Sequence, residues 1–243
     1  MKKNIRSLWS DDELQAALDA YLYMLQMELS SIPFSAAQQS NVLLTGPLSA
    51  RNSASIRYRM RNISAIIASK HLPTLSSFSP AEQVGRNVRA KLEALLATRE
   101  ETLAGIRGLQ THVRQNATNH DILRALEQLK DRLSGLEAAR PVGIGHNNPP
   151  GELEFSSEEV RSASSAVEAI ALEVSSERPE RERLIILAEF LSSFGLKASV
   201  WTGQRVTDFA KASAITAGSG FGLHLSGLGE QILSTLRLVF HMF

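Results

Sequence analysis

Apolar side chains recur every three or four residues along most of the chain, and this periodicity limits the fold more than any other feature. A first example runs from Leu14 to Leu29, where leucines and a tyrosine follow helical spacing. A period near 3.6 residues places such side chains on one face of an α-helix. No segment alternates apolar and polar residues as a half-buried strand does. The sequence therefore predicts an all-α protein.

The composition fits helix packing and argues against several kinds of site. Aromatic residues make up 6% of the 243 residues and cysteine is absent, which excludes disulfides, Cys-ligated zinc and a nucleophilic cysteine. The six histidines show no His-x-x-x-His spacing, and no Gly-x-Ser-x-Gly elbow occurs. We therefore expect a non-enzymatic protein with no catalytic residues, no metal and no cofactor.

Neither the start of the chain nor the hydropathy along it predicts membrane insertion. The start, MKKNIRSLWSDDEL, is basic but lacks the apolar run of a signal peptide. No stretch of about 18 strongly apolar residues is present. Together with the absence of cysteine, this predicts a soluble, cytoplasmic protein.

Helix starts and breaks divide the chain into four parts. Ser10 and Glu13 have the spacing of a capping box before a first helix at about 11–30. Ser53 is predicted to cap a third helix at 54 to about 70, with a core stripe of Ile56, Met60, Ile63 and Ile67. The predicted parts are a helix-turn-helix DNA-binding-like domain at 1–78, a helical hairpin or coiled coil at 79–140, a linker at 141–151, and an acidic-to-apolar helical region at 152–243.

The third predicted helix is the part best suited to DNA. No acidic residue occurs from Leu29 to Ala81, and residues 1–78 as a whole carry a net charge of +3. With Ile56 placed in the core, a helical wheel turns one set of side chains outward: Arg57, Tyr58, Arg61, Asn62 and Ala65. Arginine suits guanine and asparagine suits adenine. Phosphate contacts are expected at the entrance of the helix, from Arg51, Ser53 and Ser55.

The same region resembles a Myb/SANT-like helix-turn-helix module, as in some predicted bacterial HNH-type restriction endonucleases. The resemblance covers residues 8–80 and rests on Trp9 followed by acids, on ARNSASIRYRM at 50–60, and on Asn-Ile-Ser-Ala at 62–65. It implies a DNA-binding module. A protein-binding, SANT-like role and a basic helix that is merely solvated are the alternatives. The chain lacks the second and third tryptophans of the Myb pattern, so other apolar residues must fill their places in the core.

The predicted hairpin begins with a long helix from 80 to about 115, and its second half carries a regular apolar stripe. Successive residues of the stripe are separated alternately by four and three positions: Ile122, Leu126, Leu129, Leu133 and Leu136. Such heptad spacing is typical of helix association. Because the hairpin is long for its core, we expect this stripe to be covered by another subunit, which makes a homo-oligomer the predicted state.

The linker contains the segment GIGHNNPP at 143–150, similar to an Ile-Gly-His-Asn-Asn-Pro-Pro motif in small bacterial proteins of unknown function. Three Gly and three Pro in eleven residues favour an interdomain turn region. A peptide docking motif is one alternative. A degenerate HNH nuclease motif, with His146 as general base, is another, although no strands or nearby second histidine support it.

The C-terminal region changes from acidic to apolar. Residues 152–182 carry nine acids and three arginines, whereas no charge occurs from Ala212 to Gly229. Small residues at Gly218, Gly222, Ser226 and Gly229 permit close helix approach. The last helix has an apolar face of Leu233, Leu236, Val239, Phe240 and Phe243. A core or oligomer helix is expected, and contact with a membrane surface by an effector or adaptor is the alternative to DNA binding.

Overall fold

The computed structural model describes residues 8–111, 118–138, 155–211 and 227–242, and every element in these ranges is an α-helix. The all-α prediction is confirmed. The helices and their bounds are α1 (Asp11–Leu29), α2 (Ala36–Thr45), α3 (Ser53–Ser69), α4 (Arg86–Ala97), α5 (Glu100–Thr111), α6 (Asn119–Ala138), α7 (Ser157–Ser175), α8 (Arg181–Lys211) and α10 (Leu228–Met242).

Helix α1 lies at the centre of the fold. Its first turn is fixed by the predicted capping box, in which Ser10 and Glu13 each accept a hydrogen bond from the other's backbone amide. The helix then packs against α2, α3, α4, α5, α8 and α10. Twelve of its 19 residues are buried, as expected of a helix that is apolar on nearly all sides.

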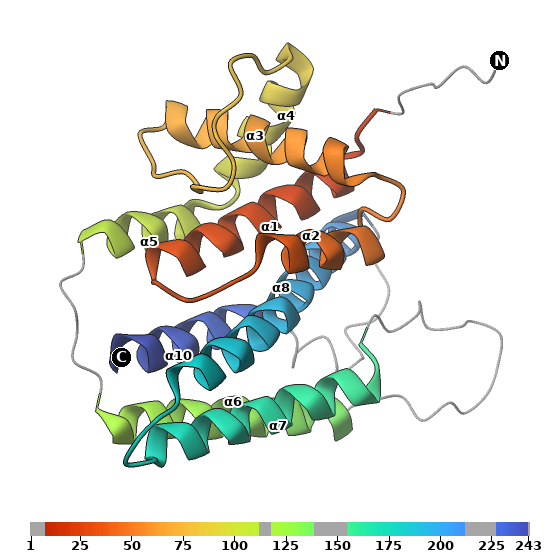
Figure 1. Cartoon of the computed structure of the whole chain (residues 1–243). Coiled ribbons are helices and arrows are strands. Elements are labelled where there is room, and N and C mark those ends of the chain that lie inside the picture. The colour runs from red at the N-terminus through yellow and green to blue at the C-terminus, as the bar shows by residue number, and fades with distance from the viewer. Residues whose placement is uncertain (1–7, 112–117, 139–154, 212–226, 243) are drawn as a thin grey trace, which may run out of the picture.

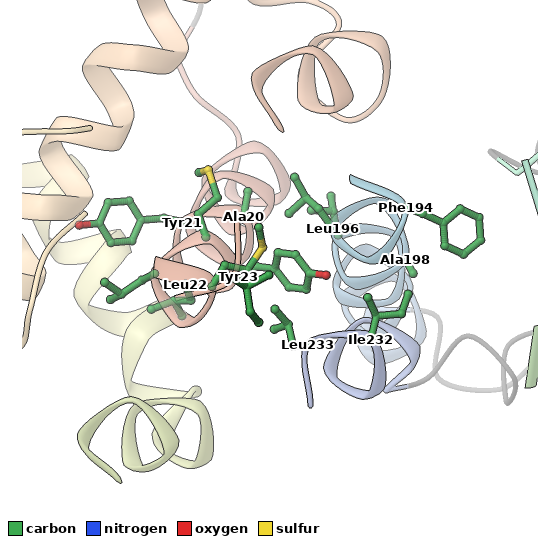
Figure 2. Close-up of a cluster of buried hydrophobic side chains, with 14 of the residues drawn as sticks. Ala20, Tyr21, Leu22, Tyr23, Phe194, Leu196, Ala198, Ile232 and Leu233 are labelled. Carbon is green, nitrogen blue, oxygen red and sulfur yellow. The ribbon is translucent and has the colours of Figure 1, made fainter. Parts of the chain in front are cut away.

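Two tyrosines show how α1 joins both halves of the molecule. Tyr21 points toward α3, and its Oη lies 2.8 Å from the Oγ of Ser64. Tyr23 points the other way, toward α8, as Figure 2 shows. The side chains on opposite sides of one helix thus contribute to one continuous core.

Helices α6, α7, α8 and α10 form a second group below α1 (Figure 1). Helix α6 packs against α7 and α10, and α8 packs against α7 and α10. The long α8 also contacts α1 and α2, so it connects this group to the N-terminal helices.

The region 79–140 does not fold as the predicted hairpin. Helices α4 and α5 pack on α1, whereas α6 packs on α7 and α10. The expected helix from 80 to about 115 starts only at Arg86 and divides at Thr98. The late start follows from tertiary contacts, because the backbone at Ser79 and Ala81 is hydrogen-bonded to Arg61 of α3 instead of entering a helix.

Close packing of α8 and α10 follows one of the predicted small residues. A Cβ atom at Gly229 would meet the Oγ of Ser199, and would lie 2.6 Å from the carbonyl oxygen of Gly195. Only glycine therefore permits this approach of the two backbones. The other three predicted small residues, at positions 218, 222 and 226, lie outside the described residues.

Candidate nucleic-acid interface

Helix α3 is held against the core by the apolar stripe that its sequence predicts. The stripe consists of Ile56, Met60, Ile63 and Ile67, all buried. Helix α3 contacts α1, α2 and α4. The helix begins one residue earlier than predicted, because Asn52 and not Ser53 is the N-cap and its Oδ1 accepts from the amide of Ser55 at 2.8 Å.

The side of α3 that faces away from the core carries Arg57, Tyr58 and Arg61, which we call the α3 outer face. All three are exposed, and Tyr58 retains 55% of its accessible surface. Arg57 and Arg61 are one helical turn apart and therefore project from the same side. Among the described residues neither arginine is paired with a carboxylate, and the Nε of Arg61 donates to the carbonyl oxygen of Ser79 at 3.1 Å.

Two residues predicted to face outward do not do so. Asn62 is only 2% exposed, and Ala65 is half-buried. The prediction failed because it treated only the four-residue stripe as covered. The segment 75–81 also packs along α3, where Ser64 donates to the carbonyl oxygen of Phe78 at 2.5 Å. Asn62 is thereby unable to reach a base edge.

Arg51 is bonded within the fold and does not project freely from the entrance of α3. Its Nε and Nη2 donate to the carboxylate of Glu13 at 2.6 and 2.5 Å, and Nη2 also donates to the carbonyl oxygen of Leu8 at 2.9 Å. The hydrogen bond from Arg51 lowers the pKa of Glu13. Of the other two entrance residues, Ser53 is exposed and Ser55 is half-buried with its amide already bonded. The predicted phosphate contact from Arg51 is therefore not available without breaking this ion pair.

A cluster around Trp9 was not foreseen from the sequence. The guanidinium groups of Arg51 and Arg59 lie 5.0 and 4.7 Å from the centre of the Trp9 ring. Such cation–π contacts stabilise a charge that has lost water. Arg59 is only 7% exposed, and its buried Nε and Nη1 have no hydrogen-bond partner among the described residues. A helical wheel places Arg59 beside Ile63 on the core side, which was the one signal available.

Further cations lie beyond α3 along the chain. Lys70 follows the last turn of α3 and Arg86 opens α4, and both are exposed. By contrast, Arg89 pairs with Glu93 at 3.3 Å and Lys91 pairs with Asp11 at 2.6 Å. Lys70 and Arg86 thus form no ion pair with a described residue, and the same holds for the exposed Arg107, Arg124, Arg178 and Arg181 on other helices or beside them.

The predicted association stripe is covered within the chain. Its five side chains, Ile122, Leu126, Leu129, Leu133 and Leu136, are each at most 1% exposed. Helix α6 packs against α7 and α10, which provide this cover. Because α7 and α10 cover the stripe, its burial does not require a second subunit.

The last helix likewise uses its apolar face inside the molecule. Leu233, Leu236 and Val239 are buried and Phe240 packs against the same core, while Phe243 lies outside the described residues. In the part of the chain that the structure describes, no helix is both long enough and apolar enough to cross a membrane. The described part of the apolar face that the sequence suggested for membrane contact thus packs against α8 and α6.

Two further hypotheses concern a metal site and the GIGHNNPP segment. Within the described ranges no three His, Asp or Glu side chains gather as a metal site would require. His146 and the whole GIGHNNPP segment lie outside these ranges.

Comparison of the chain with family models, with curated proteins and with solved structures gave no match.

Proposed function

We propose that this protein is a non-enzymatic DNA-binding protein that holds the phosphate backbone through the α3 outer face. The observation that supports this most directly is the pair Arg57 and Arg61, exposed one turn apart on a helix without a carboxylate partner among the described residues. Two such charges attract phosphates, whose negative charge dominates the affinity of most DNA-binding proteins. A cytoplasmic location, expected from the sequence, agrees with this partner.

The side chains that remain exposed favour phosphate contact over base reading. Asn62, the expected adenine reader, is buried, and Ala65 is partly covered. Arg57 and Arg61 bind phosphate without reference to sequence unless they enter the major groove. We therefore expect affinity that depends strongly on salt and weakly on DNA sequence.

Electrostatics of the rest of the chain agree with this assignment. Residues 1–78 carry +3 and residues 79–140 carry +2, whereas residues 141–243 carry −4. The acidic C-terminal region is repelled by phosphate, so DNA should approach the molecule from the N-terminal side. The chain as a whole is nearly neutral, at +1, and so binding must depend on local charge.

The test compares two double variants in a mobility-shift assay with duplex DNA. Arg57→Ala with Arg61→Ala should weaken binding at least about tenfold at moderate salt, because two phosphate contacts are lost. The control, Arg178→Ala with Arg181→Ala, removes the same charge from exposed positions in the acidic region. Equal binding by the two variants, with unchanged helical circular dichroism, would refute the proposal.

A further inference from the structure

A surface groove runs between α7 and α8, on the acidic half of the molecule. It has a volume of about 690 Å³. Helix α7 contributes a wall of small and polar residues, among them Ser162, Ser165 and Ala166. Helix α8 contributes an apolar wall formed by Ile186, Leu187 and Phe190. The two helices are consecutive, joined by a short connection, and pack against each other.

The apolar wall is unusually open to water. Ile186 is 66% exposed and Phe190 is 39% exposed. Leu172 of α7, which is 71% exposed, follows Ser165 by two helical turns and so extends the same side of α7. Large apolar side chains that line one groove mark a protein-binding surface more often than a solvent-facing one.

Carboxylates without an ion-pair partner among the described residues lie in and beside this groove. Glu158 lines it directly, while Glu182 and Glu189 flank Ile186 on the same side of α8. None of these three carboxylates forms an ion pair with a described residue. The one cation in the lining, Arg161, is already paired with Glu137 of α6. The groove therefore combines an apolar wall with unbalanced negative charge.

We propose that the α7/α8 groove binds a basic amphipathic helix of a protein partner. Apolar side chains spaced by three, four and seven residues on that helix would cover Ile186, Phe190 and Leu172. Its lysines and arginines would then face Glu158, Glu182 and Glu189. The proposal is independent of DNA binding, because the groove uses other helices and opposite charge.

The charge pattern argues against a second copy of the chain as the occupant. A two-fold interface brings the same patch of both subunits together. It would place the carboxylates of one groove against the carboxylates of the other, and like charges at an interface are unfavourable. A cationic partner removes this repulsion.

The binding experiment uses the full chain and a synthetic helical peptide of about 18 residues, built from Leu and Lys with an apolar stripe. Two control peptides separate the contributions. One has the same composition in scrambled order and so lacks the stripe; the other replaces Lys by Glu. Fluorescence anisotropy should show binding of the first peptide at least about tenfold tighter than either control. No binding of the first peptide, or equal binding of the scrambled one, would overturn the proposal.

Matched variants of the protein locate the peptide. Ile186→Ser should weaken binding about tenfold, whereas Leu8→Ser, at another exposed leucine outside the groove, should have no effect. Glu182→Gln with Glu189→Gln should weaken binding about threefold at low salt and less at high salt. The exposed pair Glu100→Gln with Glu101→Gln serves as its control.

Two results would contradict the location or the occupant. Unchanged peptide affinity in Ile186→Ser would show that the peptide binds elsewhere. A parent protein that is dimeric by light scattering, and becomes monomeric in Ile186→Ser, would show that a second copy fills the groove. Retained DNA affinity in Ile186→Ser separates both results from the proposed DNA function.

Discussion

Arg51 and Glu13 form a two-point ion pair that connects the start of α3 to the start of α1. The Nε and Nη2 of Arg51 donate to the two carboxylate oxygens of Glu13 at 2.6 and 2.5 Å. Glu13 also closes the capping box with Ser10. One carboxylate thus fixes the first turn of α1 and the position of α3, and with it the direction in which the α3 outer face points.

This ion pair predicts a pH dependence of stability. The hydrogen bond from Arg51 lowers the pKa of Glu13 below its ordinary value of 4.5. The contribution of the ion pair to the free energy of unfolding is therefore complete above about pH 5. It is lost as pH falls through the lowered pKa of Glu13 in the folded state, because Glu13 of the unfolded chain takes up its proton at a higher pH. Parent and Glu13→Gln should differ in unfolding free energy at about pH 7 and converge toward about pH 3. Urea unfolding followed by circular dichroism measures this difference, and a constant difference would contradict the prediction.

Gly195 and Tyr23 give a second prediction. A Cβ atom at Gly195 would meet the Oη of Tyr23 and would lie 3.2 Å from a methyl group of Ile232. Gly195→Ala should therefore destabilise the fold by about 1–3 kcal/mol. The control is Gly105→Ala in α5, where nothing lies within 4 Å and the lower entropy cost of alanine should stabilise the helix by about 0.5–1 kcal/mol.

Tyr23→Phe tests the same contact from the other side. The hydroxyl of Tyr23 is buried and has no hydrogen-bond partner among the described residues, so its removal should be neutral or stabilising. In combination with Gly195→Ala it should recover part of the loss, because the clashing oxygen is gone. A double-mutant cycle from thermal or urea unfolding should give a coupling of at least about 0.5 kcal/mol. Simple additivity would show that the two residues do not interact.

Substitution of Leu129 tests whether the α6 stripe belongs to the core or to an interface between subunits. Because its side chain is fully buried within the chain, Leu129→Ala should cost about 2–5 kcal/mol of unfolding free energy. The exposed neighbour Gln128→Ala should change stability little. A Leu129→Glu variant that remains folded, and differs from the parent only in having become monomeric, would restore the idea of an intersubunit stripe.

Local patterns predicted the helices well because their causes are local. The spacing of Ile56, Met60, Ile63 and Ile67 was sufficient to identify the buried stripe of α3. The capping box at Ser10 and Glu13 was predicted from a four-residue pattern and is present. Each of these features depends on neighbours within a few residues.

The pairing of helices depends on contacts between distant residues, and the sequence alone did not predict it. The α6 stripe is equally suited to any apolar partner, so its spacing cannot distinguish α5 from α7 and α10. Asn62 was expected outside and lies inside because the segment near Phe78 folds back over α3. The burial of Arg59 follows from the position of Trp9, 50 residues away. Of the eight predicted DNA-binding residues, Asn62 is buried and three are half-buried: Arg51, Ser55 and Ala65.

The salt dependence of DNA affinity tests the central proposal most directly. For a protein that contacts phosphates, the logarithm of the binding constant falls linearly with the logarithm of salt concentration, by about 0.9 for each phosphate neutralised on duplex DNA. Arg57→Ala with Arg61→Ala should therefore bind more weakly and reduce this slope by about 1.8, while Arg178→Ala with Arg181→Ala keeps the slope of the parent. An unchanged slope and affinity in the α3 variant, with its helical content intact, would show that DNA is not held by the α3 outer face.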